Sequence, residues 1–153
     1  MNKLRKQYAK QKFRTCPFCD WQAQKPELIL AETKNYYLTL NEYPYIEHHL
    51  LIAPKAHIED LSREKPGKEK DQLTKIASQL MKKLGIKDYV VLDRNGLRSG
   101  MSLAHIHRHL IPVEGPHDMF YRFADISKMW DKVKAVKKYK ELIKSTPHKN
   151  RLH

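Results

Sequence analysis

The chain has 153 residues, of which 41% are hydrophobic, and this is enough for one domain with a buried core but hardly for two. No stretch approaches about 18 consecutive apolar residues, and the basic N-terminus lacks the apolar segment of a secretory signal, so we expect a cytoplasmic protein without a membrane partner. The formal net charge of +13 lies entirely in two extensions, residues 1–14 and 132–153, which we interpret as solvated helical faces or as binding surfaces for nucleic acid.

The hydrophobic pattern predicts short strands around a long helix, and therefore an α+β domain. A short helix is expected over residues 2–13, followed by the turn "CPFCDW". Four strands are then expected, over residues 36–40, 49–54, 88–94 and 105–113. The longest helix precedes the third strand, because apolar residues recur at helical spacing from Leu73 to Leu84 and Gly85 marks an end. A second amphipathic helix is expected from Trp130 onward.

Three histidines occupy alternate positions in the last predicted strand, at His105, His107 and His109. Side chains alternate along a strand, so we expect the three imidazoles on one face. A buried strand rarely carries histidine at three positions, because each imidazole needs a polar partner. The pattern therefore indicates metal binding, base catalysis or nucleophilic catalysis. We do not expect all three on one metal ion, because the outer two would lie roughly 13 Å apart on a straight strand.

The two cysteines of the chain, Cys16 and Cys19, form a C-x-x-C pair. A redox motif is one interpretation, although no βαβ pattern surrounds the pair. A disulfide is another, although a reducing compartment disfavours it. Zinc is the interpretation that these residues favour most, but it needs two further ligands, which the spacing by itself does not name.

The stretch "HIHRHLIP" resembles the H-φ-H-φ-H-φ-φ motif of the histidine triad (HIT) superfamily of nucleotidyl hydrolases and transferases. Two further segments carry the resemblance in the same order. The segment "LNEYPYIEHHLLIAPKAHIEDL" is similar to the N-x-x-P and H-x-L-x-x-P-K-x-H region of the family, and "SGMSLAHIH" is similar to the segment that leads into the triad. The resemblance covers roughly residues 15–114.

This resemblance implies an antiparallel sheet of about five strands with a long helix, commonly in a homodimer. It also implies that His107 attacks the α-phosphorus of a nucleotide and forms a nucleotidyl-imidazole, which water then hydrolyses. His109 would donate to a phosphate oxygen, and Ser102 to the phosphate or the leaving group. His49 would order the site.

The substrate contacts that the resemblance implies have plainer alternatives. Asn41 would hold the ribose, but an Asn at this position is also typical of a turn. Phe18 and Leu40 are candidates for an apolar wall around the base, although ordinary core residues would look the same.

Several positions depart from the family pattern on the leaving-group side. Arg94 and Met101 stand where many branches carry amides. Arg94 is interpreted as a phosphate clamp, and Asn95 would take the amide role if the loop shifted by one residue. Arg108 stands at a usually apolar position, where we expect it to meet a carboxylate or less hydrophobic structure. These departures concern the identity of the substrate and not the class of reaction.

The resemblance also completes the cysteine site. In many bacterial members, and in the related galactose-1-phosphate uridylyltransferases, a C-x-x-C pair joins a histidine after the P-K-x-H strand and the first triad histidine. The corresponding residues here are Cys16, Cys19, His57 and His105. We therefore expect a structural zinc ion with four protein ligands and no open position.

The leading functional hypothesis is hydrolysis at the α-phosphate of an adenylated substrate, either a dinucleoside polyphosphate or an AMP conjugate. Three alternatives stay open. These are a phosphorylase or nucleotidyl transferase, an enzyme that removes AMP from nucleic-acid ends with the help of the basic extensions, and a non-catalytic nucleotide-binding protein. We divide the chain into a basic extension (1–14), a catalytic domain (15–125) and a basic C-terminal helix and tail (126–153).

Overall fold

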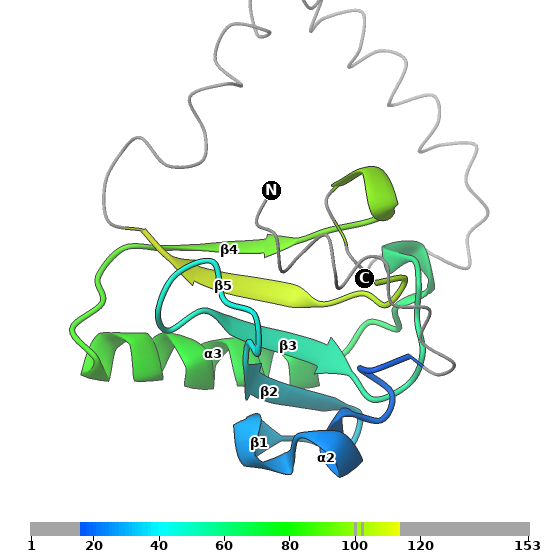
Figure 1. Ribbon diagram of the computed structural model, residues 1–153, viewed down its shortest axis with the longest axis horizontal. Helices are drawn as coiled ribbons and strands as arrows, with labels where there is room; N and C mark the ends of the chain where they lie inside the picture. Colours follow the sequence, from blue (N-terminus) through cyan, green and yellow to red (C-terminus); the bar gives the residue numbers. More distant parts are fainter. Residues whose placement is uncertain (1–15, 100, 102, 114–153) are drawn as a thin grey trace, which may run out of the picture. The chain divides into compact units, whose positions relative to one another are not determined.

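The computed structural model describes residues 16–99, 101 and 103–113 of the chain (Figure 1). Both basic extensions, the helices predicted over 2–13 and from Trp130 onward, and Ser102 lie outside these residues. The expectations about them, and the domain boundaries, therefore stay predictions. Among the described residues, no helix is long and apolar enough to cross a membrane.

Five strands of the described part form one antiparallel sheet in the order β1-β2-β3-β5-β4. Their bounds are β1 Ile29–Glu32, β2 Tyr36–Leu40, β3 Leu50–Pro54, β4 Tyr89–Asp93 and β5 Arg108–Pro112. The last of the described strands, β5, lies between β3 and β4 (Figure 1). The predicted α+β fold, an antiparallel sheet of five strands with a long helix, is therefore confirmed.

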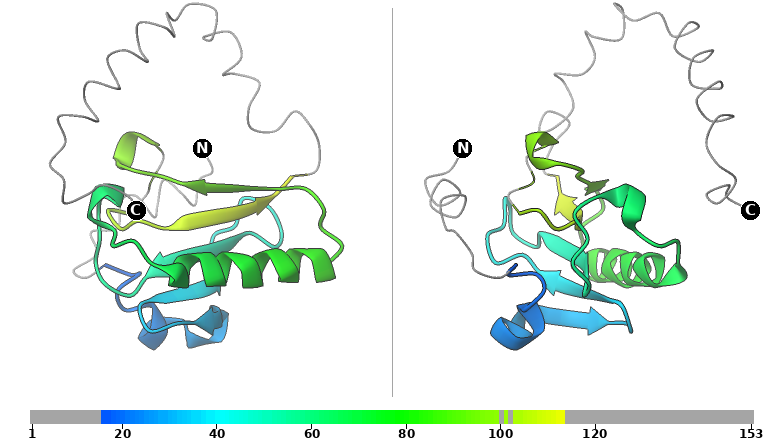
Figure 2. Two further views of the ribbon diagram at one scale, coloured as in Figure 1. Left: turned by 180° about the vertical axis from the view of Figure 1, so that it is seen from behind. Right: turned by 90° about the vertical axis from the view of Figure 1, so that its right-hand side faces the viewer.

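The helix α3 Lys68–Lys83 covers one face of the sheet (Figure 2). Leu73, Ala77 and Met81 recur at helical spacing and form its buried stripe. The strand residues buried against this stripe are Tyr36, Leu38, Leu50, Ile52 and Leu110. The helix stops beside the predicted glycine, because Gly85 adopts a φ of 77°, a left-handed conformation that favours glycine.

The opposite face of the sheet is covered by the segment that contains the short helix α2 Trp21–Gln24. The Trp21 indole N–H donates to the Thr39 hydroxyl at 3.0 Å, and the Tyr37 hydroxyl donates to the Phe18 carbonyl at 3.0 Å. The apolar side chains buried on this face are Phe18, Trp21, Tyr37, Leu51 and Ala53. These contacts hold the C-x-x-C segment against the sheet.

The short elements were not predicted from the sequence. They are β1, α2 and the 3-10 helices η1 Pro26–Leu28, η2 Leu61–Arg63 and η3 Leu97–Ser99. Each has only three or four residues, too few to repeat a helical or strand period.

The prediction of a strand over residues 105–113 was wrong at its start, because β5 begins at Arg108. The His105 N–H donates to the Leu103 carbonyl at 2.8 Å, and the Ile106 N–H donates to the Ile58 carbonyl at 2.7 Å. These two bonds bend the chain toward the loop that follows β3, so regular pairing starts only after His107. Of the three triad histidines, only His109 lies in a strand.

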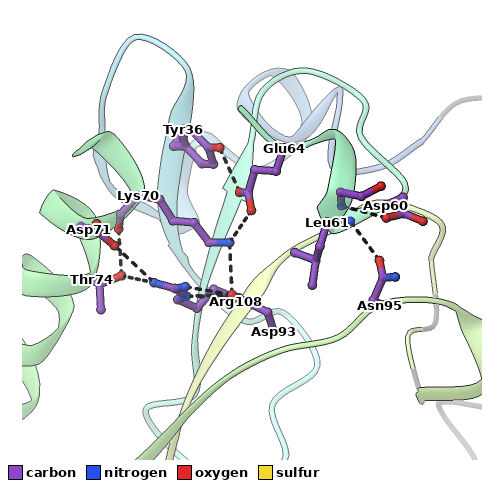
Figure 3. A network of polar contacts seen from close by, with 11 residues as sticks. Tyr36, Asp60, Leu61, Glu64, Lys70, Asp71, Thr74, Asp93, Asn95 and Arg108 are labelled. Carbon is purple, nitrogen blue, oxygen red and sulfur yellow. Dashed lines mark hydrogen bonds and ion pairs between the residues drawn. The ribbon is translucent and has the colours of Figure 1, made fainter. Parts of the chain in front are cut away.

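The α3 face of β5 carries the unusual arginine of the motif (Figure 3). Arg108 holds Asp93 with two nitrogens, Nη2 at 2.8 Å from Oδ2 and Nε at 3.1 Å from Oδ1. The Lys70 ammonium joins Asp93 at 3.2 Å and Glu64 at 2.9 Å, and the Tyr36 hydroxyl donates to Glu64 at 2.9 Å. The expectation that Arg108 meets a carboxylate is confirmed, and the network ties β4 and β5 to α3 and to the segment around η2.

Candidate active site

The first feature of the site is the ring of His107, which has only 6% of its surface exposed. Its Nδ1 lies 2.8 Å from the His105 carbonyl oxygen. A carbonyl oxygen only accepts, so Nδ1 carries the proton and Nε2 keeps its lone pair. Burial is the main cause that lowers the pKa of His107, the bond to the His105 carbonyl opposes it, and the Arg94 charge lowers it further. The ring is therefore neutral at neutral pH, with a nucleophilic nitrogen.

His49 and His109 form a hydrogen-bonded pair beside this ring. The backbone N–H of Tyr45 donates to Nδ1 of His49 at 3.2 Å, so that nitrogen is an acceptor. The other nitrogen, Nε2, then donates to Nδ1 of His109 at 2.9 Å. The remaining nitrogen of His109, Nε2, must carry a proton. His49, His107 and His109 are the three histidines predicted to be catalytic, and for this reason we refer to them as the catalytic imidazoles.

The rings of His107 and His109 lie side by side, with 4.6 Å between their centroids. One ring offers a lone pair, and its neighbour offers an N–H. A displacement at a phosphate group needs both, because a nucleophile attacks the phosphorus while hydrogen-bond donors stabilise the charge on its oxygens.

The second feature is a candidate metal site, formed by Cys16, Cys19, His57 and His105, which we call the metal cluster. Their ligand atoms all lie within 4.8 Å of one another. The distance from Sγ to Nδ1 is 3.3 Å for Cys16 and His105, and 3.4 Å for Cys19 and His57. Ligands held tetrahedrally by one zinc ion lie about 3.5 Å apart, so the residues fit a metal ion. All four residues implied by the resemblance are brought together here.

The protonation of the metal cluster also suits a metal. Nε2 of His105 donates to the Pro54 carbonyl at 2.9 Å, and Nε2 of His57 donates to Glu59 at 3.0 Å. Each Nδ1 therefore directs a lone pair at the sulfurs, with the outer hydrogen bond that metal-binding histidines usually make. Burial lowers the pKa of His105 to about 4, which keeps it neutral.

The thiol of Cys19 resists ionisation. Burial first, and the neighbouring Cys16 next, raise the pKa of the Cys19 thiol to about 11. Two thiolates side by side therefore need a cation between them. This is the situation that a bound metal ion relieves.

Two of the predicted substrate residues, Phe18 and Asn41, contact the catalytic imidazoles, and a third, Leu40, lies at the end of β2. Phe18 is buried, and its ring centroid lies 4.8 Å from that of His107, so it is a core residue that also packs against the His107 ring. The side-chain oxygen of Asn41 accepts the Tyr43 N–H at 3.0 Å, and its amide nitrogen lies 3.1 Å from Nδ1 of His49. Leu40, at the end of β2, is 38% exposed.

The residues predicted on the leaving-group side are placed differently from one another. Asn95 accepts the Leu61 N–H at 3.0 Å and so fastens the loop to the segment around η2. Met101 is buried. Arg94 donates from Nη1 to the Tyr45 hydroxyl at 2.9 Å. Ser102 lies outside the described residues.

Tyr45 is the site residue that the sequence analysis missed. Its ring centroid lies 4.7 Å from that of His49, and it stacks on His109 at 6.1 Å with 14° between the planes. The only signal in the sequence is its place four residues before His49, in a turn that also contains Pro44. Aromatic residues in turns are too common for that signal to indicate a site.

Comparison with known proteins decides the family. The HIT domain model matches residues 22–115, which is more than half of the chain. The chain belongs to the HIT domain family. The adenosine 5′-monophosphoramidase of Saccharomyces cerevisiae is 36% identical over 98 residues, which cover 63% of this chain and 61% of that protein. The chain therefore matches less than two thirds of the length of this curated HIT relative.

Solved structures of HIT proteins have the same fold. A HIT family protein from Bacillus anthracis has a TM-score of 0.70 at 19% identity, covering 88% of this chain and 99% of that one. A HIT family hydrolase from Legionella pneumophila has a TM-score of 0.54 at 26% identity, covering 70% and 97%. The prediction that the chain belongs to the HIT family is therefore confirmed.

Proposed function

We propose that this HIT protein hydrolyses adenylated nucleotides at the α-phosphate through a covalent intermediate on His107. The observation that carries the proposal is the protonation pattern of the catalytic imidazoles. The buried, neutral ring of His107 has a lone pair on Nε2, and the ring of His109 carries an N–H. The centroids of these two rings lie 4.6 Å apart. The name of the yeast relative, a monophosphoramidase acting on an adenosine nucleotide, supports AMP as the transferred group.

The reaction proceeds in two displacements at phosphorus. The Nε2 lone pair of His107 forms a bond to the α-phosphorus, and the bond from that phosphorus to the leaving group breaks, so the leaving group takes the electron pair. Water then adds its oxygen to the phosphorus, gives one proton to solvent, and the phosphorus–nitrogen bond breaks. His107 regains its lone pair, and AMP is released. His109 donates to a phosphate oxygen, and His49 keeps the His109 proton on Nε2.

We also propose that zinc occupies the metal cluster. Two thiolates and two neutral imidazoles are a ligand set that zinc prefers, and four protein ligands leave no position for substrate. The ion would hold the N-terminal segment and the loop after β3 together, and no step of the reaction passes through it.

For the partners of the chain we propose only classes of molecule. A homodimer is proposed from the family. Nucleic-acid ends would become substrates if the two basic extensions bind the strand, and a phosphorylase would differ only in using phosphate in place of water. Each of these is an outcome of the experiment that follows.

The test follows AMP release from diadenosine tetraphosphate, AMP phosphoramidate and a 5′-adenylated oligonucleotide, with and without added phosphate. We expect His107→Ala to lower the rate about a thousandfold or more, because the nucleophile is gone. His148→Ala, a matched change in the C-terminal extension, is the control. Acid quenching with labelled substrate should trap AMP on the native chain and not on the His107 variant. Equal rates for the native chain and that variant would overturn the mechanism, and ADP formed with phosphate would identify a phosphorylase.

A further inference from the structure

The contact between Arg94 and Tyr45 has no part in the steps above. Arg94 follows the last residue of β4, and its Nη1 donates to the Tyr45 hydroxyl at 2.9 Å. The guanidinium carbon lies 5.5 Å from the centre of the Tyr45 ring. The same ring lies against both His49 and His109. A fixed positive charge is therefore attached to the edge of the catalytic imidazoles.

The backbone on both sides of Arg94 is fastened. The preceding residue, Asp93, is held by Arg108 and Lys70 on the α3 face of the sheet (Figure 3). The following residue, Asn95, accepts the Leu61 N–H. With its neighbours fixed and its guanidinium held by Tyr45, Arg94 has little freedom in where it places its charge.

A guanidinium stabilises negative charge but does not supply a proton. It stays protonated in proteins, and its planar set of N–H donors matches phosphate oxygens. The two leaving groups considered for this site differ in this respect. A phosphate chain leaves as an anion, whereas an amine must gain a proton as the phosphorus–nitrogen bond breaks. Arg94 therefore assists the first kind of leaving group and not the second.

We propose that Arg94, oriented by the Tyr45 hydroxyl, makes the site selective for nucleotides whose leaving group is a phosphate chain over nucleotides joined to an amine; this rests on the function proposed above. In the first displacement, Nε2 of His107 bonds to the α-phosphorus and the bond to the bridging oxygen breaks. The bridging oxygen keeps the electron pair, and Arg94 neutralises the charge that accumulates on the departing phosphate. Arg94 is a specificity-determining residue in this scheme, and Tyr45 is a positioning residue.

The readout is a ratio: kcat/KM for diadenosine tetraphosphate divided by kcat/KM for AMP phosphoramidate. Arg94→Gln should lower this ratio about tenfold or more, because hydrogen bonds to charged groups are the strong class. Tyr45→Phe keeps the stacked ring and removes the hydroxyl, so the charge stays but loses its orientation, and the ratio should fall by about threefold. Added salt should lower the ratio of the native chain more than that of Arg94→Gln.

Two matched variants separate orientation from general effects. Arg98→Gln removes the same charge from an exposed position of the same loop, and Tyr43→Phe removes a hydroxyl from the same loop as Tyr45. Both variants should leave the ratio of the two kcat/KM values unchanged. A ratio unmoved by Arg94→Gln, or lowered as much by Arg98→Gln, would overturn the inference. In that case the native chain still releases AMP, whereas failure of the proposed function would appear as no AMP release from either substrate.

Discussion

In the metal cluster both histidines donate from Nε2, whereas His107 donates from Nδ1. The first arrangement leaves two Nδ1 lone pairs that converge on the sulfurs of Cys16 and Cys19. The second leaves one Nε2 lone pair beside the N–H of His109. The proposed roles of ligand and nucleophile thus differ in which ring nitrogen is protonated and in what lies beside the other nitrogen.

His105 belongs to both regions. Its ring is part of the metal cluster, and its carbonyl oxygen accepts the Nδ1 proton of His107. The two regions are therefore coupled through one residue, although their chemistry differs. Breaking one of them should show how far the other depends on it.

The largest effect is expected from removing a ligand of the metal cluster. Cys16→Ser should abolish stoichiometric zinc binding and lower the free energy of unfolding by about 3 kcal/mol or more, because the ion joins segments far apart in the sequence. AMP release should fall as well, since a loosened His105 no longer fixes the His107 tautomer. The measurements are zinc per chain by mass spectrometry and denaturant unfolding with and without a chelator. A variant that retains its zinc and stability would show that the cluster is not a structural site.

A smaller effect is expected within the catalytic imidazoles, from two replacements of His49. An Asn side chain places its polar group near Nδ1 and keeps the acceptor for the Tyr45 N–H, but it loses the donor to His109. A Gln side chain reaches the Nε2 position and keeps that donor. His49→Asn should lower kcat about tenfold to a hundredfold, and His49→Gln should lower it less, because only the first frees the His109 tautomer.

The comparison between these two variants is the measurement that matters. Both put a neutral amide in place of the same imidazole, so they differ in which ring nitrogen the amide replaces and in the one methylene by which Gln is longer. If kcat falls equally in both variants, or if only KM rises while kcat stays unchanged, His49 does not act by holding the His109 proton.

The sequence predicted the members of both regions better than their geometry. The spacing of Cys16 and Cys19, together with the resemblance, led to His57 and His105, because a metal site requires residue types that are rare elsewhere. A carboxylate partner for Arg108 was one of two expectations, because a charged residue stands there at a usually apolar position. These inferences depend on residue types and on the family resemblance, both of which can be read from the sequence.

Contacts between distant loops could not be predicted. The bond from the Ile106 N–H to the Ile58 carbonyl delays the start of β5 to Arg108, and no pattern in either segment predicts this bond. Tyr45 reaches the catalytic imidazoles because its turn folds back onto His49. Such bonds determine which nitrogen of each ring is protonated. The sequence alone therefore does not distinguish a histidine suited to bind metal from one suited to attack phosphorus or to donate a proton.

The smallest effect is expected on the α3 face of β5, where charged groups take the place of neutral rings. Burial acts to raise the pKa of Asp93, but hydrogen bonds and charge from Arg108 and Lys70 outweigh it and lower the pKa below its ordinary value of 3.8. A carboxyl whose pKa is lower in the folded chain stabilises the fold above its unfolded pKa. This contribution is lost as the pH falls through the folded value.

Asp93→Asn should therefore lower the free energy of unfolding by about 1–2 kcal/mol at pH 7, the scale of a half-buried ion pair. The difference between native and variant should shrink as the pH falls below about 4, because the native carboxyl is then neutral too. Asp88→Asn, an exposed neighbour of β4, is the matched control. A difference that stays constant between pH 7 and pH 3 would mean that Asp93 acts through its shape and hydrogen bonds, not its charge. The charged face of β5 would then resemble the imidazole face, where neutral groups hold the strand by hydrogen bonding.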